Sequence, residues 1–227
     1  MPALRSRFIV RFVLVVFTCI AIGDTQLRAS PIASMDDIQF WVGSGSNQAA
    51  MVIDWNDAKT PESLIWGFRW DGTATGQTML NAIEAADARL TQTPGGGGPS
   101  TVYGLGFDTD SDGFSITGSG DAGASADPHD HYKVGWFSAG FWSYWVNNNN
   151  QTTLPNQSGV GDAATRWISS GGGFTTRTLS NNSWDGWSFA PGFTSTRPSP
   201  PDAVLVPEPS MLVSAVLILA GCALRRR

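Results

Sequence analysis

The residues with the clearest chemical spacing are the carboxylates of the run Asp108-Thr109-Asp110-Ser111-Asp112-Gly113. Acids at the first, third and fifth positions and glycine at the sixth open a calcium loop, because hard oxygens converge on the ion and glycine permits the sharp turn. An EF-hand needs glutamate at the twelfth position, which here is Ser119. A full EF-hand is thereby excluded, and the spacing leaves two interpretations, of which the first is a calcium-bound β-turn formed by Asp108, Asp110 and Asp112, with Asp121 as a nearby further ligand. The alternative is a solvated hairpin turn, because Asp-Gly is a common hairpin signal.

The only two histidines lie together in Asp127-Pro128-His129-Asp130-His131-Tyr132. On a strand, His129 and His131 would point to one face and could share a transition metal, with Asp127 as a third ligand. The set is incomplete, because neither a cysteine nor a distant histidine is present to close it. A loop or strand start with partly exposed histidines is therefore the favoured interpretation.

Catalytic patterns are weak. The chain has no Gly-x-Ser-x-Gly motif around a nucleophile, and its two candidate bases lie within three residues of each other. Paired carboxylates such as those of glycoside hydrolases are available among Asp54, Glu62 and Glu84, but no spacing singles out a pair. We therefore expect a non-enzymatic protein, with a secreted polysaccharide-active hydrolase as the alternative.

Aromatic residues supply the remaining signal, since all ten tryptophans lie between residues 41 and 187. A domain without disulfides needs a large apolar core, so most of these rings should be buried. In the run Trp142-Ser143-Tyr144-Trp145, however, aromatic side chains point to both faces of one strand. We expect Trp142, Tyr144 and Trp145 to include exposed rings that stack on a glycan, next to the amides of Asn147 to Asn150 and Gln151.

These candidate sites need a framework of short strands. Runs rich in β-branched and aromatic residues alternate with glycine, asparagine and aspartate turns. The expected strands are Ile38–Val42, Ala50–Trp55, Leu64–Trp70, Thr101–Phe107, Phe114–Thr117, Tyr132–Phe137, Phe141–Val146, Arg166–Ser169 and Ser183–Phe189. Residues 78–90 instead place apolar side chains at helical spacing, with Thr78 as the cap. This pattern predicts a mainly β, β-sandwich-like single domain with one amphipathic helix.

Charge and cysteine content limit the partners. Residues 30–206 contain seven basic and 17 acidic residues, a net formal charge of −10. Such a domain is a poor match for nucleic acid or anionic lipid, which need basic patches. Both cysteines, Cys19 and Cys222, lie in the apolar ends of the chain, so the domain between them has no thiol chemistry.

The first 29 residues have the pattern of a secretory signal peptide. Arg5, Arg7 and Arg11 precede an apolar run over residues 12–22 that is shorter than a membrane-spanning helix. Small residues suited to cleavage follow at Ala21/Gly23 and at Ala29/Ser30, and both sites remain open. We therefore divide the chain into a signal peptide (1–29), a tryptophan-rich β domain (30–194), a proline-rich extended spacer (195–206) and a C-terminal tail (207–227).

The tail combines three parts in a fixed order: Pro207-Glu208-Pro209, an apolar segment over residues 211–224, and Arg225-Arg226-Arg227. Fourteen residues rise about 21 Å as a helix, short of a hydrocarbon core of about 30 Å. The arginines should stay cytoplasmic, so the domain would lie outside on a brief transmembrane tether. A plain tail anchor is the alternative to a processed one.

This order resembles the PEP-CTERM sorting signal of bacteria that secrete exopolysaccharide. The resemblance covers about the last 22 residues and implies that an exosortase-like enzyme recognises Pro207, Glu208 and Pro209 and processes the tail. The expected location is therefore the membrane, followed by the cell surface or extracellular matrix, with exopolysaccharide or another glycan as a partner. The stretch from Gly43 to Gly72 and the runs 130–132 and 142–145 also resemble uncharacterised bacterial secreted proteins, which implies no activity.

Overall fold

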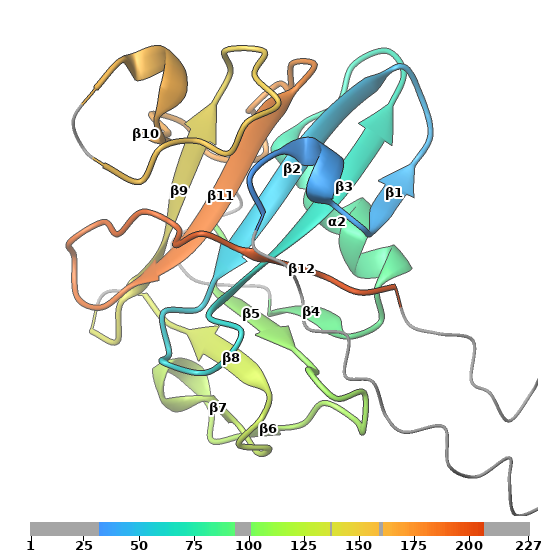
Figure 1. Cartoon of the computed structure of the whole chain (residues 1–227). Helices are drawn as coiled ribbons and strands as arrows, with labels where there is room; N and C mark the ends of the chain where they lie inside the picture. The colour runs from blue at the N-terminus through green and yellow to red at the C-terminus, as the bar shows by residue number, and fades with distance from the viewer. Residues whose placement is uncertain (1–31, 94–100, 137, 159–160, 207–227) are drawn as a thin grey trace, which may run out of the picture.

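The computed structural model describes residues 32–93, 101–136, 138–158 and 161–206 (Figure 1). The expected signal peptide (1–29) and sorting tail (207–227) lie outside the described residues. Within the described part of the chain, no helix is long and apolar enough to cross a membrane.

A seven-stranded mixed sheet forms the centre of the domain, in the order β1-β3-β2-β11-β9-β10, with β12 pairing on β3. Neighbouring strands are antiparallel in the pairs β2/β3, β11/β9 and β9/β10, and parallel in β11/β2, β1/β3 and β12/β3. The strands are β1 (Trp41–Gly43), β2 (Asn47–Asp54), β3 (Ser63–Trp70), β9 (Phe141–Asn147), β10 (Ile168–Ser169), β11 (Ser183–Ala190) and β12 (Asp202–Ala203).

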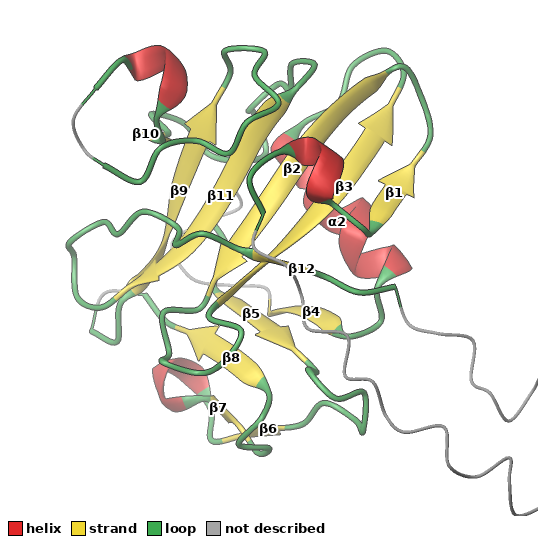
Figure 2. Cartoon of the chain, in the orientation of Figure 1, coloured by secondary structure: helices red, strands yellow, loops and turns green. Residues whose placement is uncertain are grey.

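The other elements lie around this sheet (Figure 2). A three-stranded antiparallel sheet has the order β4-β5-β8, and β6 pairs with β7 in a separate hairpin. The strands of these two smaller sheets are β4 (Leu90–Thr93), β5 (Gly104–Phe107), β6 (Ile116–Thr117), β7 (Ala124–Ser125) and β8 (His131–Val134). The helical elements are α2 (Gly76–Ala86) and the 3-10 helices η1 (Met35–Asp37), η2 (Gly120–Ala122) and η3 (Ala163–Thr165).

Both faces of the large sheet are covered, which explains why β2 and β11 are long uninterrupted buried runs. On one face, Trp66 of β3 packs with Ile83 of α2 and Phe107 of β5 in the larger apolar cluster. On the other face, Trp145 and Trp184 pack with Met35 of η1 in a second cluster. Eight of the ten tryptophans are buried, which confirms that these rings mainly build the core.

The mainly β class with one α-helix is confirmed, and each of the nine expected strand regions overlaps a strand, while β4, β7 and β12 were not expected. The helix limits were wrong. The helix spans Gly76–Ala86 with Thr75 as its cap, and Leu90 belongs to β4 instead. Residue 87 ends the helix because the buried carboxylate of Asp87 accepts a hydrogen bond from Trp66 Nε1 (3.0 Å) and pairs with Arg89 (2.8 Å).

The expected spacer over residues 195–206 is corrected, because much of this segment packs against the domain. Its chain is extended, but β12 pairs with Leu64 and Ile65 of β3, and Val204 is 1% exposed. The backbone N–H of Ser199 donates to Asp54 Oδ2 (2.7 Å), and the Arg197 guanidinium lies over the Trp145 ring, 5.0 Å from its centroid. In Figure 1 the segment runs across the large sheet in an extended conformation. Proline prevents a helix here but does not prevent edge pairing.

Candidate functional site

The candidate binding site is a groove of about 280 Å³ beside the N-terminal part of β9. We call it the aromatic groove. Its volume is near the lower limit for small-molecule sites. Aromatic side chains form much of its wall, and a glycine-rich turn forms another part. The lining residues are Thr101, Trp136, Phe141, Trp142, Tyr144, Ser170, Gly171, Gly172, Gly173 and Trp187.

Exposed aromatic rings stand at the rim of the groove. Trp136 is 37% exposed and meets Phe141 edge to face, with ring centroids 6.4 Å apart. Phe141 in turn stacks on Phe193, which is 57% exposed, at 5.5 Å and 19° between planes. Three rings therefore form a continuous aromatic patch at the surface, which marks a binding site more often than a scattered apolar residue does.

The loop that carries Trp136 is tied to Asp121. The Asp121 carboxylate accepts hydrogen bonds from the Tyr103 hydroxyl (2.7 Å), the Ser138 hydroxyl (3.1 Å) and the backbone N–H of Trp136 (3.4 Å). These bonds lower the pKa of Asp121, with the Tyr103 hydroxyl as the main cause. Asp121 therefore positions the groove rim and is not the expected further ligand of the Asp108–Gly113 loop.

Deeper in the groove, Tyr144 stacks on Trp187 with ring centroids 4.3 Å apart and planes at 18°. The Tyr144 hydroxyl donates a short hydrogen bond to Asp185 Oδ2, and Arg177 Nη2 donates to Asp185 Oδ1 at 2.6 Å. Burial raises the pKa of both the Asp185 carboxyl and the Tyr144 hydroxyl. The Tyr144 ring is thus held by a stack on one side and a buried polar network at its tip.

The N-terminus of α2 packs closely against this network. A Cβ at Gly76 would lie 2.5 Å from the Tyr144 hydroxyl and 3.1 Å from Asp185 Oδ2, so only glycine fits. The helix N-terminus carries partial positive charge, which favours a carboxylate nearby. A glycine at the first helical position therefore allows Asp185 and Tyr144 to approach the helix.

The structure separates the three aromatic residues expected to bind a ligand. Trp142 and Tyr144 lie on the face of the larger cluster and line the groove, while Trp145 lies on the opposite face in the second cluster. Trp142 and Trp145 are only 5% and 6% exposed, so the expectation of an open stacking surface on these two rings was wrong. Trp142 contributes to the depth of the groove, and Trp145 does not line it.

The side-chain amides of Asn147 and Asn150, which were expected to bind sugar hydroxyls, have other partners. Asn147 is buried, and its Nδ2 donates to the carbonyls of Ala164 (3.1 Å) and Arg166 (2.9 Å). Asn150 Oδ1 accepts from Asn182, and the Gln151 carbonyl accepts from Trp184 Nε1. Asn147 ends β9, Asn150 and Gln151 follow it, and none of the three lines the groove, so the amides of Asn147 and Asn150 organise loops.

The carboxylates of Asp108, Asp110 and Asp112 do converge, with one oxygen of each within 4.8 Å of the others. Asp108 Oδ1 and Oδ2 also accept from the backbone N–H groups of Ser111 (2.7 Å) and Gly113 (3.1 Å), which shapes the turn. Repulsion from Asp110 is the main cause that raises the pKa of Asp112. The loop presents the oxygens that calcium requires, and its occupation stays a prediction.

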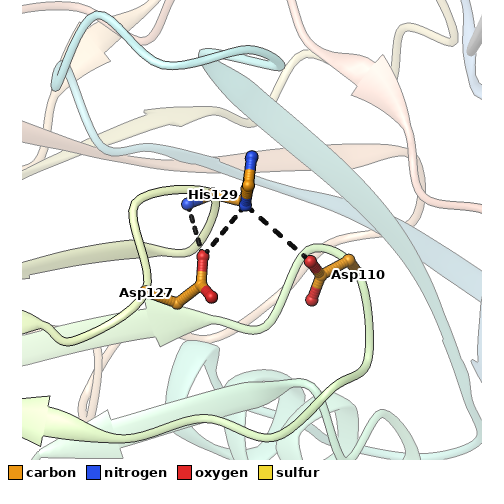
Figure 3. A group of neighbouring side chains, drawn as sticks. All are labelled: Asp110, Asp127 and His129. Carbon is orange, nitrogen blue, oxygen red and sulfur yellow. Dashed lines mark hydrogen bonds and ion pairs between the residues drawn. The ribbon is translucent and has the colours of Figure 1, made fainter.

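The two histidines do not converge. His131 begins β8, is fully buried, stacks on Trp55 at 4.7 Å, and holds Asp57 at 3.1 Å through Nδ1. His129 lies in the preceding loop with its side chain 73% exposed. There it approaches Asp127 (3.2 Å) and Asp110 (4.0 Å), as Figure 3 shows. The favoured loop interpretation therefore holds for His129, while His131 is a core residue.

The carboxylates considered for glycoside hydrolysis have separate surroundings. Asp54 is 2% exposed and accepts from the backbone of Asn56 (2.8 Å) and Ser199 (2.7 Å). Glu84, on α2, accepts from the backbone of Gln92 (2.8 Å), and Glu62 is exposed. The described residues that line the aromatic groove include no carboxylate.

The groove was not evident from the sequence because its walls come from distant segments. Trp136 was one of ten tryptophans and fell within the expected strand Tyr132–Phe137, whereas β8 ends at Val134 and the chain turns at Gly135, where φ is 153°. Residues 170–173 read as a turn, and nothing local placed that turn against Phe141 and Trp187. No protein-family model, curated protein or solved structure matches this chain.

Proposed function

We propose that this protein is an exported surface or extracellular-matrix component that binds a neutral glycan in the aromatic groove, in a structural or adhesive role. The observation that carries the proposal is the exposed Trp136 at the rim of a groove lined by Phe141 and Tyr144. Flat aromatic faces match the C–H faces of sugar rings. The hydroxyl groups at the edges of the stacked sugar then remain free to form hydrogen bonds.

Polar groups at the groove are few and suit a neutral ligand. Thr101, Ser170 and the peptide groups of residues 171–173 are the polar part of the lining, and sugar hydroxyls can both donate to and accept from groups of this kind. The net charge of −10 over residues 30–206 disfavours polyanions, but not uncharged sugars. A flat, neutral, hydroxyl-rich ligand therefore fits the groove better than a nucleic acid.

Export and sorting belong to the same proposal. The signal pattern in residues 1–29 would direct the chain across the membrane, and an exosortase-like enzyme would process the tail at Pro207-Glu208-Pro209. The β-sandwich-like domain with its single helix would then be exposed outside the cell. Calcium at Asp108, Asp110 and Asp112 would stabilise that domain without entering the groove.

A glycan array with the purified protein tests the binding function. We expect neutral glycans to bind the wild type, and the Trp136→Ala variant to lose that signal. Ile168→Ala is the matched control, because Ile168 is 40% exposed and lies outside the groove. Equal binding by the wild type and Trp136→Ala would contradict the proposed site. Release of reducing ends from the producing organism's exopolysaccharide would instead favour the hydrolase.

A further inference from the structure

Two loops meet at the end of the small sheet, and both carry metal-ligating groups. Phe107, the last residue of β5, pairs with His131, the first residue of β8, so Asp108 after β5 and Asp130 before β8 are neighbours. The chain leaves β5 through residues 108–113, forms the β6–β7 hairpin, and returns through residues 127–130. Carboxylates from the outgoing and returning segments are thereby placed together.

One group of side chains from these two loops combines oxygen and nitrogen donors. Asp110, Asp127 and His129 each place one ligand atom within 4.8 Å of the others. His129 Nδ1 lies 3.2 Å from Asp127 Oδ1 and 4.0 Å from Asp110 Oδ2. Ligand atoms bound to one zinc-sized ion lie about 3 to 3.5 Å apart. A small movement of the Asp110 side chain would therefore bring all three ligand atoms within binding distance of one ion.

An independent observation comes from Asp130, which directly follows His129 and is fully buried. Its Oδ1 accepts from the backbone N–H of Thr109 (2.9 Å), between Asp108 and Asp110, while its Oδ2 is buried without a hydrogen-bond partner. Lys59 reaches the Asp130 main-chain carbonyl, not its carboxylate. A buried carboxylate oxygen without a hydrogen-bond donor is costly, and a cation bound at this loop junction would offset that cost.

We propose that Asp110, Asp127 and His129 bind a divalent transition metal such as zinc, above the buried carboxylate of Asp130. Imidazole nitrogen is a good ligand for zinc and a poor one for calcium, which prefers oxygen alone. The site differs from the calcium loop of Asp108, Asp110 and Asp112, with which it shares Asp110. A metal here ties both ends of the β6–β7 excursion, a role that disulfides cannot fill in this cysteine-free domain.

Metal titration of the chelator-treated protein, made without a polyhistidine tag, tests the proposal. A hundredfold excess of Zn²⁺ over its Kd should raise Tm by about 5 to 10 °C. The imidazole signals in the NMR spectrum provide a direct readout, because the chain has only two histidines and His131 is buried against Asp57. Zinc should shift the His129 signal and leave the His131 signal in place.

The variants separate this site from a calcium-only loop. His129→Ala and Asp127→Asn should each weaken zinc binding about tenfold or more, with calcium binding unchanged. Asp36→Asn, which removes an exposed carboxylate from η1, is the matched control and should leave zinc affinity as in the wild type. Zinc binding that is absent, or that His129→Ala does not weaken, would overturn the proposal, as would binding of calcium alone.

Discussion

Tyr144 and Trp187 are direct cross-strand partners on β9 and β11, and their rings stack at 4.3 Å between centroids. The pair links the core to the aromatic groove, because both rings line the groove and both belong to or pack on the larger apolar cluster. The Tyr144 hydroxyl is fixed by Asp185, whose other oxygen is bound to Arg177. The shape of the groove therefore depends on a buried charged network.

Two substitutions in this network should lower the free energy of unfolding by different amounts. Tyr144→Phe keeps the stack and removes one hydrogen bond to a carboxylate, so the free energy of unfolding should fall by about 1 to 3 kcal/mol. Asp185→Asn leaves the nearly buried Arg177 without its counter-charge and should cost about 3 to 5 kcal/mol. Urea unfolding of both variants measures the difference. If both variants lost the same free energy of unfolding, the view that the Arg177–Asp185 ion pair stabilises the fold more than the Tyr144–Asp185 hydrogen bond would be contradicted.

Asp54 should make the fold less stable as pH rises. Burial raises the pKa of this carboxyl above its ordinary value of 3.8, even though Ser199 and Asn56 donate to it. Folded Asp54 therefore keeps its proton to a higher pH than the unfolded chain, and this contribution lowers stability as pH rises from 3.8 through the folded pKa. In Asp54→Asn that contribution is absent.

The check is Tm for the wild type and Asp54→Asn at a series of pH values from about 4 to 7. The Tm of the variant should improve relative to that of the wild type as pH increases. A difference in Tm that is constant over the series would show that Asp54 does not titrate with folding.

Residues 196–205 should behave as part of the domain. A chain ending at Ser195 loses β12 and the buried Val204, so its free energy of unfolding should be lower by about 3 kcal/mol or more than that of a chain ending at Val206. Gly186→Ala tests the same contact, since its Cβ would lie 2.6 Å from the Pro198 ring. Equal thermal stability of the two chains would restore the spacer interpretation.

Sorting of the tail is tested by the mass of the mature protein. Processing should remove Arg225-Arg226-Arg227, and changing Pro207-Glu208-Pro209 to alanines should leave full-length protein in the membrane. A wild-type mature protein whose intact mass still includes the three arginines would favour a plain tail anchor.

Local patterns predicted the strands well because strand formation depends on short runs of β-prone residues between turns. The helix was shifted because Leu90 fits the helical spacing as well as it fits a buried strand position. The burial of Trp142 and Trp145 could not be predicted, since alternation shows only that they face opposite sides, and tertiary packing covers both sides of β9.

The candidate sites show the same limit. Spacing alone brought Asp108, Asp110 and Asp112 together, because they lie within one turn. The approach of Asp127 and His129 to Asp110 depends on the pairing of β5 with β8, which no local pattern reveals. Proline content suggested a detached spacer over residues 195–206, although an edge strand such as β12 tolerates proline beside it.

The most direct test of glycan recognition in the groove is isothermal titration calorimetry of a neutral glycan selected on the array. Wild type and Ile168→Ala should bind with the same Kd, whereas Trp136→Ala should raise the Kd about tenfold. Gly171→Gln should also abolish binding without loss of stability, because a Cβ at Gly171 meets no atom within 4 Å and the longer side chain can fill the groove. Unchanged affinity in both Trp136→Ala and Gly171→Gln would show that the aromatic groove is not the glycan site.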